Sequence, residues 1–266
     1  MAKLDGNMGF TGSLGNISAY KRKGSGGIIL RTKGGPSGNK VKHDPAFENT
    51  RRNNAEFGGA SSAAKAIRNA FFPVKHISGA SLGHINKLTR ALANRDTQNP
   101  WGRRTVRFSE NRPLLEGFNL NKLLSLSSIL RQPPAGSINR SAGSASLVIP
   151  ALVPGINFKL PAAYKLCHFI VMLAVIPDFE HISPTAPYYR PVAPVTYPTE
   201  VFTTDWFAAT EHLPEQQLYL QLKNFTGLPD GHSLVLALGI EFGLPVSSRL
   251  IETIPKNGVA LILASA

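Results

Sequence analysis

One stretch decides the fold class: Ser233-Leu234-Val235-Leu236-Ala237-Leu238-Gly239-Ile240-Glu241-Phe242. Successive side chains of a β-strand point to opposite faces, so residues of equal parity share a face. Leu234, Leu236, Leu238, Ile240 and Phe242 would then lie on one face, and Val235 and Ala237 on the other. This alternation predicts a β-strand.

Around this strand, the chain after residue 143 consists of further short runs of β-forming residues separated by proline and glycine. Of the 20 prolines in the whole chain, 13 fall after residue 140. Because no helix of 10–15 residues separates the predicted strands, we expect an antiparallel β-sandwich over residues 143–266, Ig-like or jelly-roll-like, rather than a parallel α/β sheet. The further strands are predicted at Ala145–Ile149, Leu166–Ile176, Glu200–Thr203, Gln217–Leu222 and Val259–Ala264.

The first 43 residues predict a basic, glycine-rich arm. Two strand-like runs, Asn16–Tyr20 and Ile28–Thr32, flank the loop Lys21–Gly27, which favours a β-hairpin with three adjacent cations at its tip. An isolated hairpin is marginally stable in water, so we expect this one to have a partner.

Residues 44–142 predict a mainly helical, basic region, which makes the whole chain α+β. Asp44-Pro45 is a favourable helix start. We expect this first helix to be interrupted at Gly58-Gly59 and to end at Pro73. Its apolar face would carry Ala63, Ile67 and Phe71, and a second helix is predicted over residues 81–95.

The remainder of this region is less regular. Arg103–Phe108 has the character of a short basic strand, and Asn119–Leu130 is compatible with a helix or a strand. The apolar run Val259–Ala264 predicts a core strand; were it instead a sheet edge, it could pair with a neighbouring subunit.

Charge is distributed unevenly. The chain has 29 Lys and Arg against 16 Asp and Glu, a net charge of +13. Residues 1–140 hold 23 basic and 7 acidic residues, whereas residues 141–266 hold 6 and 9. A positive field attracts polyanions, of which nucleic acid is the commonest in a cell.

Three basic groups are the candidate polyanion-binding residues. Phosphate contacts by these groups would be salt-sensitive and largely independent of sequence. The alternatives are a solvated face or docking to an acidic partner protein, and Tyr20 could stack on a base or pack within the hairpin. The groups are Lys21, Arg22, Lys23, Arg31, Lys33, Lys40 and Lys42; Arg51 and Arg52; and Arg103, Arg104 and Arg107.

No motif predicts catalysis, a metal or a cofactor. The seven histidines are scattered, the glycine repeats favour flexible turns over a phosphate-binding loop, and Cys167 is the single cysteine. Cys167 and His168 are strand neighbours, so they would face opposite ways and could not act as a catalytic pair. Asp178 and Glu180 could pair across two residues, and the Glu211-His212 dipeptide lacks an evident third partner. We therefore predict a protein that is not an enzyme.

Two kinds of segment that would direct a protein to a membrane or out of the cell are missing from this sequence. The chain has no run of 18 or more uncharged apolar residues, and its first residues lack the apolar region of a secretion signal. We expect a protein of the cytoplasm, or of the interior of an assembled particle, with no membrane partner.

Three stretches carry a family resemblance: Gly15–Lys21, Arg31–Gly35 and Thr50–Gly58. They resemble a group of uncharacterised proteins from Bacteroidetes-type bacteria, whose pattern is a basic hairpin, a helix with an R-x-N-x-E-F-G-like stretch, and a β-rich C-terminal part. Leu114–Phe118 and Pro154–Phe158 also fit this pattern. The resemblance covers most of the chain and implies no catalytic residues.

A basic arm ahead of a neutral-to-acidic β scaffold favours a structural or assembly protein, such as a subunit of a phage-like or virion-like particle. The arm would contact nucleic acid or a neighbouring subunit, and the protein would form a homo-oligomer or a larger assembly. The alternatives are a nonspecific nucleic-acid-binding protein of the cytoplasm and an adaptor whose sandwich binds a partner by strand addition.

Overall fold

The computed structural model describes residues 2–4, 9–24, 26–74, 82–161, 164–182, 188–194, 197–247, 250–255 and 257–266. The chain forms two compact units, Met1–Arg51 and Arg52–Ala266. These boundaries differ from the expected divisions after residues 43 and 142. The first expected division lies inside the N-terminal unit, and the second separates two strands of one hairpin, Ala135–Asn139 and Ser144–Ile149.

The N-terminal unit is built on an antiparallel four-stranded sheet of order β1-β4-β3-β2. The predicted hairpin is confirmed as β3 and β4, in which Ser18 pairs with Arg31 and Tyr20 with Ile29. The short helix α1 follows and was not expected from the sequence; the side chain of Ser37 caps its first turn. The bounds are β1 (Ala2–Leu4), β2 (Gly12–Leu14), β3 (Ile17–Lys21), β4 (Ile28–Thr32) and α1 (Gly38–His43).

The first long helix begins as predicted but is not interrupted. Asp44 accepts a hydrogen bond from the backbone N of Ala46, a 3-10 turn η1 (Pro45–Phe47) follows, and α2 (Glu48–Ala70) then runs through Gly58 and Gly59. The predicted break is wrong because Gly59 lies against the ring of Tyr189, where a Cβ would come within 2.7 Å of ring carbons. A glycine here lets another segment approach the helix closely. The helix ends at Ala70, so Pro73 lies beyond it in η2 (Phe72–Val74).

The second helix, α3 (Leu82–Ala93), agrees with the prediction over its described part, whereas Ser81 lies outside the described residues. It packs against α2, where the hydroxyl of buried Thr89 donates a 2.8 Å hydrogen bond to the carbonyl of Ala60.

The C-terminal unit is organised around two long antiparallel strands, β7 (Leu166–Pro177) and β13 (His232–Pro245), at the centre of a six-stranded sheet. Leu236 pairs with Leu173 in the middle of their ladder. All six predicted strands are present. The other strands of this sheet are β10 (Glu200–Thr203), β11 (Phe207–Ala208), β14 (Ile251–Thr253) and β15 (Val259–Ser265).

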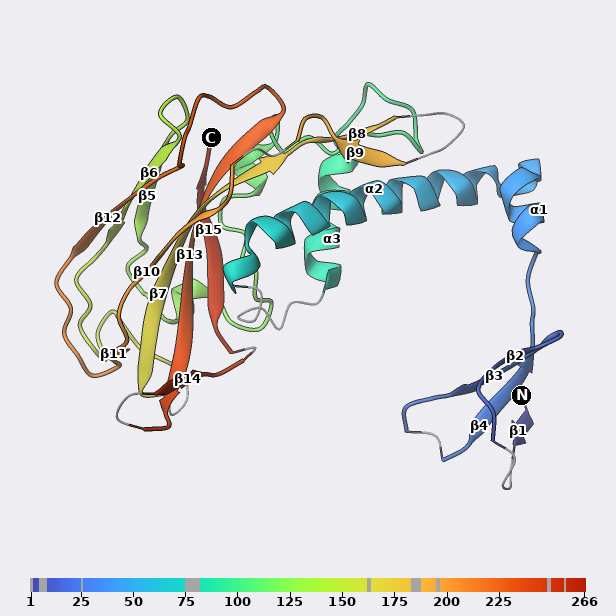
Figure 1. Ribbon diagram of the computed structural model, residues 1–266, viewed down its shortest axis with the longest axis horizontal. Coiled ribbons are helices and arrows are strands. Elements are labelled where there is room, and N and C mark those ends of the chain that lie inside the picture. The colour runs from blue at the N-terminus through green and yellow to red at the C-terminus, as the bar shows by residue number, and fades with distance from the viewer. Residues whose placement is uncertain are drawn as a thin grey trace. The chain divides into compact units, whose positions relative to one another are not determined.

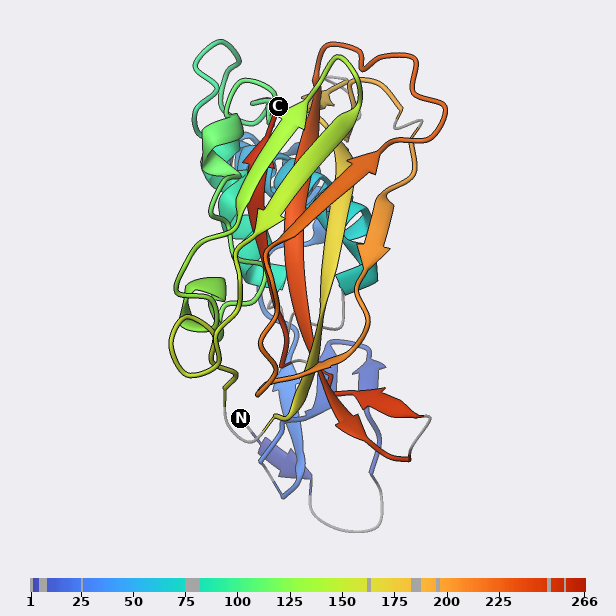
Figure 2. The same ribbon diagram turned by 90° about the vertical axis from the view of Figure 1, so that its left-hand side faces the viewer.

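Both faces of this sheet are covered. The helices α2 and α3 lie on one face, and a three-stranded sheet lies on the other (Figures 1 and 2). Met172 and Val235 belong to the apolar cluster on the helix side, whereas Leu173 and Leu236 belong to the cluster shared with the three-stranded sheet. This is why β13 is apolar at both parities. The smaller sheet has the order β12-β6-β5, formed by β5 (Ala135–Asn139), β6 (Ser144–Ile149) and β12 (Gln216–Gln221).

The segments between helices and strands are held by single bridges rather than regular elements. Val106 bridges to Phe179 in the short β8 (Phe179–His181), which pairs with β9 (Tyr189–Pro191), so Arg103–Phe108 is not a full strand. Within Asn119–Leu130 the only described helical turn is η4 (Leu126–Ser128), and η3 (Arg112–Leu114) lies upstream of that stretch.

The predicted core strand near the C-terminus is confirmed as β15. Its outer edge is occupied: Gly117 N donates to Ile262 O, and Ile262 N donates to Phe118 O. Leu120 N donates to Ala260 O at 2.7 Å. A neighbouring subunit could pair with this edge only by displacing residues 117–120. No helix among the described residues is long and apolar enough to cross a membrane.

Candidate polyanion-binding surface

The first basic group gathers on the N-terminal unit. Lys21 ends β3 and is followed in the turn by Arg22 and Lys23, while Arg31 lies near the other end of the β4 ladder and Lys33 follows it. Lys21 is paired with Ile28, three residues from Arg31, so the two clusters are roughly 10 Å apart at about 3.3 Å per strand residue. All of these side chains are exposed.

These cations are available to a ligand. Lys40, on α1, lies 3.9 Å from Asp44 and keeps 58% of its side chain exposed. Over residues 9–24 and 26–51, the structure contains no ion pair for Lys21, Arg22, Lys23, Lys33 or Lys42. The N-terminal unit has nine Lys and Arg against three Asp and Glu. Its field is therefore strongly positive.

Arg31 and Tyr20 make a pair within this surface. The guanidinium carbon of Arg31 lies 5.5 Å from the centroid of the Tyr20 ring, within the range of a cation–π contact. Of the two roles expected for Tyr20, the structure shows packing within the hairpin: its ring lies against the exposed Arg31.

The second basic group does not form one site. Arg51 donates from Nη1 to the backbone oxygens of Val41 and Asp44, at 2.9 and 2.8 Å, and so joins the end of α1 to the start of α2. Arg52 lies over the ring of Trp101, 5.8 Å from its centroid. Arg51 and Arg52, which the sequence suggested as phosphate-binding residues, thus each contact a different part of the protein itself.

The third basic group is mostly neutralised by acids. Arg104 donates to Glu56 from Nε at 2.6 Å and from Nη2 at 3.1 Å, and Glu56 is only 2% exposed. Arg107 pairs with Glu110, which raises its pKa further. Arg103 remains exposed. Phosphate binding by Arg104 or Arg107 would require one of these ion pairs to break.

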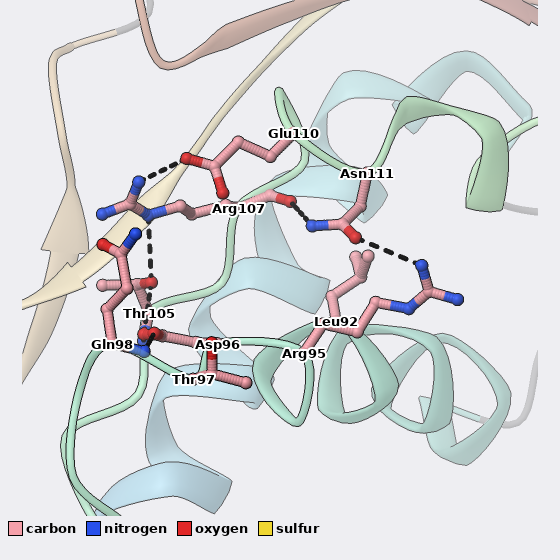
Figure 3. Close-up of a pocket in the computed structure, with 9 residues that line it drawn as sticks. All are labelled: Leu92, Arg95, Asp96, Thr97, Gln98, Thr105, Arg107, Glu110 and Asn111. Atoms are coloured by element: carbon pink, nitrogen blue, oxygen red, sulfur yellow. Dashed lines mark hydrogen bonds and ion pairs between the residues drawn. The ribbon is translucent and has the colours of Figure 1, made fainter.

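A small pocket lies beside this third group (Figure 3). It encloses about 80 Å³, far below the roughly 300 Å³ at which pockets for drug-sized ligands begin. Its lining carries two cations, Arg95 and Arg107, and two acids, Asp96 and Glu110, and Arg95 reaches the side-chain oxygen of Asn111 at 3.5 Å. Opposite charges therefore balance along its walls. The full lining is Leu92, Arg95, Asp96, Thr97, Gln98, Thr105, Arg107, Glu110 and Asn111.

Asp96 organises the pocket floor. It accepts hydrogen bonds from the backbone N and hydroxyl of Thr105, both at 2.7 Å, and from the backbone N of Gln98 and Asn99. Burial raises the pKa of this carboxyl, but the hydrogen bonds from Thr105 and Asn99 outweigh it and hold the pKa well below its ordinary value. The carboxylate stays ionised as a structural acceptor, and the pocket is best explained as a packed polar junction.

The acidic residues Asp178, Glu180 and Glu211 take structural positions. Asp178 accepts hydrogen bonds from the backbone N of Phe108 and Ser109 at 2.7 and 3.0 Å, and from the Ser109 hydroxyl. Glu180 instead reaches Arg190 at 3.5 Å, so the pairing expected between Asp178 and Glu180 does not occur. Glu211 accepts from the backbone N of Ala208, a local turn contact.

A buried polar pair was missed by sequence reasoning. His168 and Glu241 are directly opposite on β7 and β13, with Nε2 and Oε2 3.0 Å apart, and Trp206 stacks on the imidazole at 4.0 Å. Cys167 is buried on the other face, as predicted, and burial strongly raises the pKa of its thiol. The signal was an acid, Glu241, within an apolar strand: a buried charge needs a partner.

No group of three or more His, Cys, Asp or Glu within the described ranges is arranged to hold a metal. Comparisons with known proteins give no family by which to interpret these surfaces: no protein-family model, no curated protein and no solved structure matches the chain. The resemblance to the Bacteroidetes-type group thus stays a prediction.

Proposed function

We propose that this is a non-enzymatic structural or assembly protein whose basic N-terminal unit binds nucleic acid or another polyanion, as a subunit of a phage-like or virion-like particle would. It would act in the cytoplasm or within the assembled particle. One observation carries the proposal: the cations of the hairpin are exposed and lack ion pairs in the described part of their unit, whereas Arg104 and Arg107 are paired with acids.

We further propose that the six-stranded and three-stranded sheets are the two halves of a β-sandwich that serves as the scaffold. The apolar cluster between them supports this, since Leu147 of β6 and Leu220 of β12 join Val171 and Leu236 in one core. The helices α2 and α3 would cover the outer face of the larger sheet.

Salt dependence tests the polyanion proposal. Changing Lys21, Arg22 and Lys23 together to Glu should weaken binding to a single-stranded oligonucleotide. The negative slope of log K against log salt should become shallower by about 2, because each lost phosphate contact removes about 0.7 from its magnitude. A matched control changes the exposed cations Lys65, Lys87 and Lys122 of the C-terminal unit to Glu. Equal losses in the two variants would show that only total charge matters, and would refute the assignment to the hairpin.

Assembly is favoured by the free edge of the larger sheet. Among the described strands, β10 pairs with β7 alone, and its Val201 and Phe202 are each 42% exposed. Open edges with apolar side chains invite pairing with another chain. Size-exclusion chromatography with light scattering should show an oligomer that Phe202→Lys dissociates. A strict monomer at high concentration, free of nucleic-acid absorbance, would contradict the assembly function.

A further inference from the structure

The face of the N-terminal sheet that carries Tyr20 and Arg31 has a definite layout. Ser13 pairs with Ser18 and Ser18 with Arg31, so these three side chains cross the sheet in one row. Tyr20, two residues after Ser18, lies on the same face in the next row. The aromatic ring and the guanidinium are therefore diagonal neighbours on one surface.

The ring holds the arginine in place. The Arg31 guanidinium lies over the Tyr20 ring, and the residue as a whole is exposed to solvent. On the β3 side, the neighbours of Arg31 in its row are serines, which are small, and Ser13 is itself exposed. A planar cation is thus presented with less rotational freedom than a lysine would have.

A flat, exposed guanidinium suits one class of ligand. Nucleic-acid bases stack on aromatic rings and on arginine planes when they are free of a partner strand, and bases within a duplex are already stacked on each other. Cations stand on both sides of the platform, Lys33 at one end and the Lys21–Lys23 turn at the other. They lie where the phosphates flanking a stacked base could be reached.

We propose that Arg31, supported by Tyr20, is a stacking platform for a base of single-stranded nucleic acid, and that the flanking lysines bind its phosphates. This deepens the proposed polyanion binding and rests on it. It adds a distinction that charge alone cannot make: the unit should prefer single strands over duplexes, and over polyanions that contain no bases.

The decisive variant is Arg31→Lys, which keeps the charge and removes the plane. We measure binding of the full-length protein by fluorescence anisotropy to an unstructured deoxythymidine oligomer, to the same backbone without bases, and to heparin. Stacking of one base on an aromatic side chain contributes roughly 5- to 150-fold in affinity, and we expect the lower end of that range for a guanidinium. Arg31→Lys should therefore weaken binding to the oligomer at least five-fold, and should leave binding to the abasic strand and to heparin within about two-fold.

Two further variants separate stacking from folding. Tyr20→Phe keeps the ring and should behave as the wild type, whereas Tyr20→Leu should reproduce the loss in Arg31→Lys. Circular dichroism of each variant checks that the unit remains folded. Equal binding of the oligomer and the abasic strand by the wild type, or an Arg31→Lys loss of the same size for all three ligands, overturns the platform.

The two levels of proposal fail differently. If the wild type binds none of the three polyanions, the proposed function itself is wrong. If it binds all three, and Arg31→Lys changes none of them, polyanion binding stands and only the base-stacking inference is rejected.

Discussion

Replacing Glu56 by Ala should destabilise the C-terminal unit substantially. The Glu56 side chain lies on the buried side of α2 and accepts three hydrogen bonds, two from Arg104 and one of 2.9 Å from the backbone N of Gly102. Glu56 is 2% exposed and the Arg104 side chain 21% exposed. The substitution leaves Nε and Nη2 of Arg104 and the Gly102 N–H without their acceptor, while Nη1 keeps its 3.1 Å hydrogen bond to the Asn94 side chain.

The size of the effect follows from the burial. Removing one partner of a buried ion pair costs roughly 3–5 kcal/mol. Since Arg104 is about one-fifth exposed, water can solvate part of the released cation, and we expect the lower end, about 3 kcal/mol. For a unit of this size, that corresponds to a fall in Tm of roughly 6–12 °C.

The matched control is Glu110→Ala. Glu110 also pairs with an arginine, but its side chain is 59% exposed and that of Arg107 is 37% exposed, so the loss should stay below about 1 kcal/mol. Differential scanning calorimetry and urea unfolding monitored by circular dichroism give both values. If Glu56→Ala and Glu110→Ala lower the free energy of unfolding equally, the argument from burial is refuted.

Three further predictions concern single positions. Gly58→Ala should raise the free energy of unfolding by about 0.5–1 kcal/mol, because open space surrounds its helical position, whereas Gly59→Ala should lower it through a clash with Tyr189; thermal unfolding of the pair decides. The low pKa of Asp96 predicts stability that is full above its ordinary value of 3.8 and is lost as the pH falls below it, so urea midpoints of Asp96→Asn should depend less on pH in that range. Native Cys167 should react slowly with a thiol reagent such as dithionitrobenzoate and rapidly in urea, and fast native labelling would contradict its burial.

The strands were predictable and the helix continuity was not. Leu166–Ile176 and Ser233–Phe242 are apolar at both parities, and such runs form strands buried on both faces once helices and a second sheet cover them. The Gly58-Gly59 pair lowers helix propensity, yet α2 passes through it. The ring that packs on Gly59 belongs to Tyr189, which is distant in sequence, so no local sequence pattern could predict the contact.

The basic site could be predicted only in part, because composition does not reveal which charges are paired. The Arg107–Glu110 pair has the i,i+3 spacing that sequence can suggest, although the contact lies outside regular helix. The Arg104–Glu56 pair joins residues 48 positions apart and depends on the tertiary fold. Exposure of Lys21, Arg22 and Lys23 was foreseeable from the glycine-rich loop that carries them.

The pairing of charges bears on where a polyanion would bind. Two opposite charges in contact act at a distance as a dipole, and salt screens the remaining field over about 8 Å at physiological ionic strength. The pairs of Arg104, Arg107 and Arg190 therefore contribute little to the distant field of their unit. Among the N-terminal cations Lys40 is paired with Asp44, whereas Lys21, Arg22, Lys23 and Lys33 have no ion pair in the described part of their unit, so their fields add. Electrostatic capture should therefore be concentrated on the hairpin, even though the basic residues extend to residue 140.

The same unit has little core with which to hold itself together. Among its described residues the buried apolar side chains are Ala19, Ile28 and Ile29, and α1 buries none. A sheet with so small a core gains stability from any ligand that binds its folded form alone, by an amount that grows with ligand concentration over Kd. A polyanion that contacts both ends of the β3–β4 ladder would have this effect, since it bridges residues that must be in register before they can bind it. Ordering of the N-terminal unit and capture of the polyanion would then be one coupled equilibrium.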